Sequence, residues 1–297
     1  MDRLVWIFGS SRSGSTWLLR MLSEVDGVVP IDDPHLGHHL GVWRPIPLAW
    51  AASPEPPDLT TLLEVKKEQP GYFFAERYRD QWWEPLKQLI TARFEAQGPE
   101  HLNGYRGDPV YVVKEPGSHV AGLLTELFPG STLIFLLRDG RDVVDSWLAA
   151  YRDGSWAIPE GAFPVAPWGR LSLLRWLADV WVYRTAEVRR AFEAHAPGRR
   201  VLVRYEDLRA DTQRALADVC AAAGLSADAA AAIAERHSFD QVPEAERGES
   251  KAIRSAEPGG WRQNLTPAEQ AALEEIMGPT LAELGYESST AASRAAA

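Results

Sequence analysis

Short apolar runs alternate with longer stretches of mixed polarity along most of the chain. The runs at residues 4–8, 110–114, 132–137 and 200–203 are rich in Val, Ile, Leu and aromatic residues. An apolar run of this length, ended by Gly or a charged residue, is typical of a strand buried on both faces of a parallel sheet. We therefore expect four strands at these positions.

The stretches between and after these runs carry apolar residues at intervals of three or four, which predicts helices. The expected helices cover residues 14–24, 59–97, 118–128, 139–151, 171–195, 211–223 and 227–236. A last helix is expected to begin at Thr266, where Pro267 suits the first helical position and Glu269 completes a capping box. Residues 26–58 are rich in Pro, His and Trp and weakly periodic, which predicts a long functional loop.

Strands that alternate with helices in this way predict a three-layer α/β/α fold with a mostly parallel central sheet. The sequence shows no internal repeat and no linker that would divide the chain. We therefore expect a single domain over residues 1–297, with a frayed tail of small and polar residues at about 288–297.

Composition narrows the range of partners. The 297 residues carry a net charge of −10, which argues against nucleic acid or an anionic membrane but allows a small anion bound by local arginines. No apolar run approaches the ~20 residues of a membrane span, so we expect no membrane insertion. The single cysteine, Cys220, excludes a disulfide framework, and the absence of a secretory signal pattern predicts a cytoplasmic protein. Nothing in the sequence fixes the number of subunits.

The segment Gly9–Thr16 lies between the first expected strand and the first expected helix. Glycines at this spacing let the backbone wrap around an anion, with loop N–H groups and the positive end of the helix directed toward it. The spacing matches the Walker loop, G-x-x-x-x-G-K-S/T, except that Ser15 replaces the lysine. The sequence therefore predicts a phosphate-binding loop in a fold of the P-loop type, with positive charge from Arg12.

A second departure from nucleotide triphosphatases follows the apolar run at residues 133–137. Those enzymes usually end such a strand with a carboxylate that helps to hold magnesium, whereas here the next residue is Arg138. The loop is therefore expected to bind a phosphate-like group rather than a metal-bridged triphosphate.

Two motifs together carry a resemblance to a known family. Residues 11–17 fit a pattern in which Pro or Ser and a basic residue precede Ser-Gly-Ser/Thr-Thr-Trp/Leu, and Arg138 is followed eight residues later by Ser146. In this combination the chain resembles the sulfotransferases that use 3′-phosphoadenylyl sulfate (PAPS) and release adenosine 3′,5′-bisphosphate (PAP). The resemblance implies that Arg138 and Ser146 hold the 3′-phosphate, as the guanidinium fork matches phosphate oxygens. It further implies that the 5′-phosphosulfate is held by Ser11, Arg12, Ser13, Gly14, Ser15 and Thr16. Trp17 at the end of the motif is a candidate to stack on the adenine, and packing in the core is an equally good interpretation of this residue.

Three further segments extend the resemblance from residue 5 to about 266. Tyr205 begins a Tyr-Glu-Asp-Leu segment after an expected strand, and the resemblance places it near the adenine. Arg254 is implied to hold the 3′-phosphate, in a partial match to a late segment from which Ser255 and Ala256 depart. Lys114 ends an expected strand in a segment of the form Lys-x-His/Pro.

Sulfuryl transfer needs charge stabilisation at the leaving oxygen and a base for the acceptor hydroxyl. Arg12 and Lys114 are the candidates for the first role. Many cytosolic members of the family use the histidine of Lys-x-His as the base, but this chain has Pro116 there. Protein-tyrosine members use a glutamate about 21 residues after the loop cation, and the same count leads here to Asp33, with His35 as a second candidate.

Other interpretations of these residues stay open. Glu115, His38, His39 and His119 are further candidates for the base, and the adjacent aspartates at 32 and 33 are also suited to capping a turn. His35, His38 and His39 beside these aspartates have the residue types of a zinc site. The donor chemistry requires no metal, so we expect none.

Aromatic residues gather in the stretch before the second expected strand and in the later loop at residues 152–169. Aromatic residues on irregular segments often line ligand pockets, although packing is as common a role. They are Trp43, Trp50, Tyr72, Phe73, Phe74, Trp82, Trp83, Trp156, Phe163 and Trp168. We therefore expect transfer to a hydroxyl, or less readily an amine, of an apolar or aromatic small molecule or natural product. The alternatives are a P-loop small-molecule kinase, which would need magnesium and ATP, and a catalytically silent nucleotide-binding module.

Overall fold

The computed structural model describes residues 3–40, 71–102, 104–159, 162, 164–248, 251 and 257–287. These residues form two compact units. The first holds the described residues up to 137 together with 184–238, and the second holds 138–183 together with those from 239 onward. Each unit is described by itself below.

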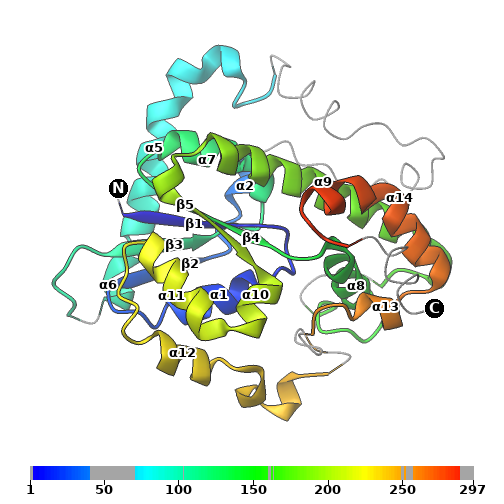
Figure 1. The fold of residues 1–297 in the computed structure, drawn as a ribbon. Coiled ribbons are helices and arrows are strands. Elements are labelled where there is room, and N and C mark those ends of the chain that lie inside the picture. Colours follow the sequence, from blue (N-terminus) through cyan, green and yellow to red (C-terminus); the bar gives the residue numbers. More distant parts are fainter. Residues whose placement is uncertain are drawn as a thin grey trace. The chain divides into compact units, whose positions relative to one another are not determined.

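A parallel sheet of five strands forms the centre of the first unit in the described part of the chain (Figure 1). In spatial order the strands are β2 (Val28–Asp32), β3 (Val110–Lys114), β1 (Leu4–Phe8), β4 (Thr132–Leu137) and β5 (Arg200–Arg204). Each neighbouring pair is parallel. The sheet confirms the predicted P-loop-type α/β fold and the four predicted strands, and it contains a fifth.

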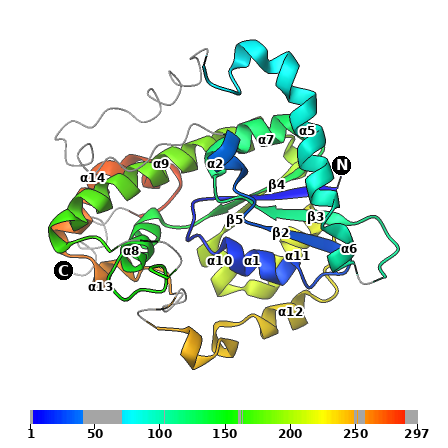
Figure 2. The same ribbon diagram turned by 180° about the vertical axis from the view of Figure 1, so that it is seen from behind.

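Helices cover both faces of this sheet, as Figures 1 and 2 show from opposite sides. One face carries α1 (Ser15–Leu22), α10 (Tyr205–Ala210), α11 (Thr212–Ala222) and α12 (Ala230–Arg236). The other carries α5 (Arg79–Glu95), α7 (Ala121–Leu127) and the last turns of α9 (Arg170–Ala194). Two further helices in the described part of this unit are short, α2 (Leu36–Leu40) and α6 (Gly98–His101).

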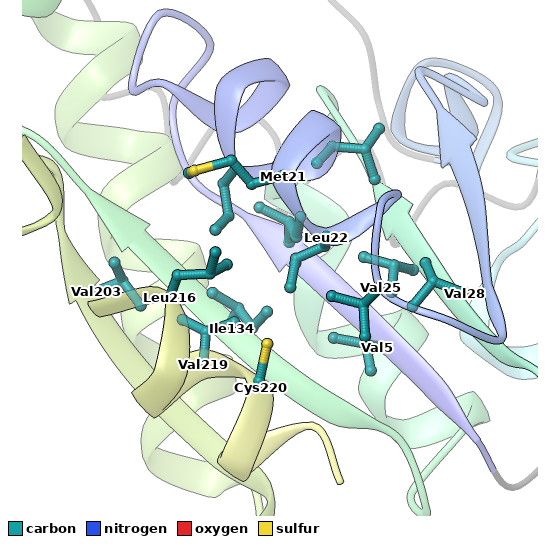
Figure 3. Packing of buried hydrophobic residues seen from close by; sticks show 14 of the residues in the cluster. Val5, Met21, Leu22, Val25, Val28, Ile134, Val203, Leu216, Val219 and Cys220 are labelled. Carbon is teal, nitrogen blue, oxygen red and sulfur yellow. The ribbon is translucent and has the colours of Figure 1, made fainter. Parts of the chain in front are cut away.

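The core of the first unit follows from the alternation of side chains along the strands. Val5 and Ile7 of β1 belong to a buried cluster with α1 and α11, shown in Figure 3. Trp6 and Phe8 are buried outside this cluster, and the Trp6 ring lies 6.1 Å from that of Phe94 on α5. Each large apolar side chain buried in this way stabilises the fold by about 1.5–3 kcal/mol.

The prediction of a continuous loop over residues 26–58 was wrong in its first part, because this stretch contains β2 and α2. Pro30 interrupts the apolar run of β2 and hides the pattern of a strand. Proline has no N–H to donate to a sheet, so it is tolerated on an edge strand, and β2 is at the edge of the sheet. Residues 41–58 lie outside the described residues, as do 59–70 of the predicted helix 59–97 and the predicted tail at 288–297.

The second unit contains the beginning of α9 together with α8 (Gly140–Ala150), α13 (Trp261–Asn264) and α14 (Pro267–Glu283). Arg141 of this unit is buried. It forms an ion pair of 2.7 Å with Asp139, and its guanidinium lies 4.3 Å from the centre of the Trp261 ring. The predicted capping box of α14 is confirmed, because Glu269 accepts a hydrogen bond from the Thr266 amide at 2.8 Å and Thr266 caps the helix in return.

Short 3₁₀ turns complete the described secondary structure, at Glu76–Tyr78, Ser118–Val120, Pro167–Gly169, Pro197–Arg199, Phe239–Gln241 and Glu244–Glu246. Within the described ranges, no helix combines the length and apolar character needed to cross a membrane.

Asp179 on α9 gives the second unit a pH-dependent stability. Burial raises the pKa of its carboxyl from 3.8 to about 6, because desolvation disfavours the charged form. The folded state therefore holds this proton more tightly than the unfolded chain does, and the free energy of unfolding falls as the pH rises through this range.

We expect Asp179→Asn to raise the melting temperature at about pH 7.5, where it removes a partly buried charge, and to have a smaller effect at about pH 4.5. Thermal unfolding followed by circular dichroism at both pH values measures this. An equal gain at both values would contradict the assignment.

Candidate active site

The predicted phosphate loop joins β1 to α1 in a tightly constrained conformation. A side chain at position 9 would overlap the carbonyl oxygen of Leu136 on β4. The position where the chain leaves β1 therefore requires glycine. Gly14 has a φ of 89° in the left-handed region, which favours glycine. Ser13 braces the loop internally, because its hydroxyl donates to the carbonyl of Ser10 at 2.6 Å.

The start of α1 is arranged to receive an anion. Its N-cap residue, Gly14, provides no side-chain cap, and no acidic residue lies in the first turn. The first N–H groups of a helix have no partner within the helix, and the helix dipole is positive at this end. The loop and the start of α1 therefore have the features that suit an anion, and phosphate binding by this loop stays a prediction.

The aromatic side chains of Trp17 and Tyr205 pack against each other beside the loop. Tyr205, the first residue of α10, is buried and lies so close to Gly14 that a Cβ there would be 2.7 Å from its ring. The ring of Trp17 meets that of Tyr205 edge-on, with centroids 6.3 Å apart. The Trp17 indole N–H donates to the carbonyl of His237 at 2.9 Å, which fixes its orientation.

Lys114 links the end of β3 to this loop. Its ammonium donates to the hydroxyl of Thr16 at 2.8 Å and forms ion pairs with Asp32 at 2.6 Å and Asp33 at 3.0 Å. The lysine side chain is only 7% exposed, whereas the two aspartates are about half exposed at 56% and 42%. The structure thus brings Lys114, Asp33 and the loop together, as residues acting on one site require.

Asp32 was not assigned a role at the site from the sequence. In the sheet register it lies directly opposite Lys114, because β2 pairs with β3. The available signal was the run Val28-Val29-Pro30-Ile31, which ends in an aspartate as a buried strand ends in a polar residue. Recognising the edge strand despite its proline would have placed Asp32 at the site.

His35, the second candidate base, lies in the same turn as Asp33. Its Nδ1 is 3.0 Å from Nδ1 of His38, and the two rings stack with centroids 5.0 Å apart. One nitrogen of such a pair must accept while the other donates, so the two imidazoles cannot both be charged in this contact. Burial is the main cause that lowers the pKa of His38. No group of three or more metal-ligating side chains is found in the described part of the chain.

Arg138 and Ser146 belong to the second unit, whereas the loop and Lys114 belong to the first. Arg138 is half-buried and directly follows β4, and Ser146 lies in α8. Asp142 on α8 accepts hydrogen bonds from the amides of Gly259 at 2.7 Å and Trp261 at 3.2 Å. These bonds tie the start of α8 to the segment before α13. Arg254 lies outside the described residues.

Several of the predicted pocket aromatics form one cluster in the first unit. The Phe74 ring is 5.5 Å from that of Trp82, which lies 5.6 Å from Trp83. The Tyr72 hydroxyl donates to the carbonyl of Leu40 at the end of α2. Trp82 is buried, so part of this cluster is packing. Trp43, Trp50 and Phe163 lie outside the described residues, and Trp168 is exposed.

Comparison with known families decides the identity. The profile of the Sulfotransferase family matches residues 5–229. The chain belongs to the sulfotransferase family. The match includes the loop, Lys114, Arg138, Ser146 and Tyr205, and it confirms the resemblance that the motifs indicated. Sulfuryl transfer is the reaction of this family.

Solved sulfotransferase structures share the fold. Mouse sulfotransferase SULT7A1 complexed with PAP has a TM-score of 0.57 and 14% identity, over 95% of this chain and 85% of that one. The sulfotransferase of Alicyclobacillus acidocaldarius has a TM-score of 0.50 and 14% identity, over 94% and 93%. Sulfotransferase STF9 of Mycobacterium avium has a TM-score of 0.50 and 16% identity, over 96% and 77%. No match was found among curated protein sequences.

The loop geometry of this sulfotransferase predicts the effect of a methyl group at Gly14. Gly14→Ala puts a Cβ into the left-handed region and against the Tyr205 ring. We expect it to lower the free energy of unfolding by about 1–2 kcal/mol.

The matched control is Gly122→Ala on α7, where nothing lies within 4 Å of an added Cβ. That variant is expected to be neutral or to gain up to about 1 kcal/mol, because alanine suits a helix better than glycine. Urea unfolding measures both variants. Equal effects at the two positions would show that the loop does not require glycine at position 14.

Proposed function

We propose that this sulfotransferase transfers a sulfuryl group from PAPS to a hydroxyl group of an apolar or aromatic small molecule. The observation that carries the proposal is the junction of Lys114 with Thr16, Asp32 and Asp33. It joins a buried cation and candidate proton acceptors to a loop that is shaped for a phosphate-like group. Charge stabilisation and proton acceptance are the two functions that sulfuryl transfer requires of the protein.

The donor proposal rests on how the loop residues fit an anion. The glycines at both ends of the loop, the uncapped start of α1 and the cation of Arg12 suit the 5′-phosphosulfate, which would supply the sulfuryl group. Trp17 and Tyr205 offer aromatic surface for an adenine. Arg138 and Ser146 are proposed to bind the 3′-phosphate, by analogy with the family motif. The proposal needs no metal ion.

In the proposed reaction Arg12 and Lys114 stabilise the negative charge that develops on the sulfuryl and leaving oxygens. Asp33 is the first candidate to accept the proton of the acceptor hydroxyl, and His35 is the second. Asp33 suits this role because its carboxylate is 42% exposed on one side and lies against Lys114 on the other. A proton accepted there stays beside the cation that stabilises the departing charge.

The acceptor class follows from the aromatic side chains near this turn. The hydrogen bond from Tyr72 to Leu40 joins the aromatic cluster to α2, the helix that follows the Asp33–His35 turn. Aromatic surface joined to the helix that follows the candidate base favours an apolar or aromatic acceptor over a heavily charged one. A cytoplasmic location and a single functional domain stay predictions from the sequence.

We expect PAP to raise the melting temperature without magnesium, because a ligand that binds only the folded state stabilises it by about 2.7 kcal/mol at 100 times its Kd. Differential scanning fluorimetry with PAP, and with ATP and magnesium, measures this. Stabilisation by ATP and magnesium alone would favour the kinase alternative. Stabilisation by PAP without transfer of labelled sulfate to any acceptor in a panel of phenols and alcohols would favour the silent module.

Two substitutions should separate catalysis from donor binding. Lys114→Met keeps the apolar stem and removes the charge, so we expect turnover to fall by ~10²–10³ with a smaller change in PAP affinity. Arg138→Ala should chiefly weaken PAP binding, because it removes a bidentate phosphate ligand. Isothermal titration with PAP and labelled-sulfate transfer measure both. Unchanged PAP affinity in Arg138→Ala would show that the 3′-phosphate assignment is wrong.

A further inference from the structure

The carboxylate of Glu115, the residue after Lys114, binds three backbone amides. Glu115 is 1% exposed. One of its oxygens accepts from the amide of Leu36 at 2.8 Å, and the other accepts from the amides of Gly37 at 3.1 Å and Gly117 at 2.6 Å. A buried carboxylate is costly unless hydrogen bonds compensate it. Burial raises the pKa of Glu115, and the three amide hydrogen bonds oppose this rise because they stabilise the charged form.

The donors come from two segments that are far apart in the sequence. Leu36 and Gly37 begin α2, and Gly117 follows β3. The backbones of Gly37 and Gly117 are in direct contact, because a Cβ on either glycine would overlap the other residue's main chain. Glu115 therefore binds α2 against the end of β3 at a point where no side chain lies between them.

The turn that this contact holds has an unfavourable backbone. Asp33 has a φ of 47° and His35 a φ of 56°, both in the left-handed region that residues other than glycine rarely adopt. Such a conformation persists only where the surrounding structure imposes it. On one side of the turn the Asp33 amide donates to the carbonyl of Lys114 at 3.2 Å, and on the other side Glu115 holds Leu36 and Gly37.

We propose that Glu115 is a positioning residue, which holds the Asp33–His35 turn so that the Asp33 carboxylate meets the Lys114 ammonium. Lys114 and Glu115 are consecutive. The same short stretch of backbone therefore carries the cation that pairs with Asp33 and the carboxylate that holds the turn containing Asp33. Glu115 is not itself the base, because both of its oxygens are engaged and buried. The contact of Asp33 with Lys114 is independent of any substrate. Only the expected effect of Glu115 on turnover rests on the proposed function.

The test is the reactivity of the Lys114 amine toward acetic anhydride, measured by mass spectrometry on the ligand-free protein with Lys87 on α5 as internal reference. In the wild type Lys114 is buried and held by Thr16, Asp32 and Asp33, so it should react slowly. We expect Glu115→Gln to raise its rate of acetylation about tenfold, because the amide group cannot accept all three hydrogen bonds and the turn relaxes away from Lys114.

The matched control is Glu126→Gln on α7, which removes an exposed carboxylate paired with Arg79. It should leave the Lys114 rate unchanged. If Glu115→Gln does not fold, Glu115→Asp takes its place, since it keeps the buried charge but is too short by one methylene to reach all three donors. A folded Glu115 variant with the wild-type Lys114 rate would overturn the proposal.

A double-mutant cycle distinguishes positioning through Asp33 from a general loss of local stability. Asp33→Asn alone should raise the Lys114 rate, and adding Glu115→Gln should raise it little further, because both changes break the same contact. Independent effects that multiply in the double variant would overturn the proposal.

Labelled-sulfate transfer from PAPS to 2-naphthol supplies the functional readout. We expect Glu115→Gln to lower kcat about tenfold with the affinity for PAP unchanged, because the Glu115 carboxylate bonds to Leu36, Gly37 and Gly117, which lie outside the phosphate loop. If the wild type neither binds PAP nor transfers sulfate, the proposed function fails while the acetylation result still decides the role of Glu115. A weakened PAP affinity with unchanged kcat would contradict positioning of the turn.

Discussion

The rest of the site depends on the interactions of the buried Lys114 ammonium with its partners. A buried cation is tolerated only where it is paired and hydrogen-bonded, and here two carboxylates and one hydroxyl provide its partners. Those partners come from β2, from the turn after it and from α1, while the lysine comes from β3. The charge can therefore be accommodated only when the edge strand, its turn and the phosphate loop are all in their native places.

The order of the strands explains how these groups meet. Ligands of parallel α/β sheets bind beyond the carboxyl ends of the strands, where the chain changes direction across the sheet. β1 occupies the middle of the order β2-β3-β1-β4-β5, so the loop that follows it lies beside the ends of its neighbours. Gly9 makes this proximity feasible, because any side chain there would collide with β4. The sheet places the loop beside the end of β3, because Ile7 of β1 pairs with Lys114, and the hydrogen bond from Lys114 to Thr16 then joins the two.

The sequence predicted the strands, the loop and the cation because each has a local signature. The buried strands are uninterrupted apolar runs, and the loop has fixed glycine spacing. β2 escaped prediction because Pro30 masks it, and only its edge position makes that proline acceptable. The position of Asp32 at the site was not predicted either, because it depends on the sheet register that pairs Asp32 with Lys114. The anchoring by Glu115 depends on the contact of Gly37 with Gly117, which no local pattern reveals.

The charge balance of the cluster assigns different tasks to Lys114 and Arg12 in the proposed reaction. Lys114 is one positive charge between two carboxylates, so this cluster carries a net charge of −1 and cannot by itself attract an anionic donor. Attraction in the proposed reaction must then come from the backbone N–H groups at the start of α1 and from Arg12, within a protein whose net charge is −10. In the proposed reaction Lys114 acts during the transfer of the sulfuryl group rather than during binding of the donor. When charge develops on the transferred group, the ammonium can strengthen its bond to that group as it weakens its bonds to the aspartates, and the released carboxylate becomes a better proton acceptor. In the proposed reaction the cluster would couple charge stabilisation to proton acceptance, so the position of Asp33 relative to Lys114 would matter as much as the identity of its side chain.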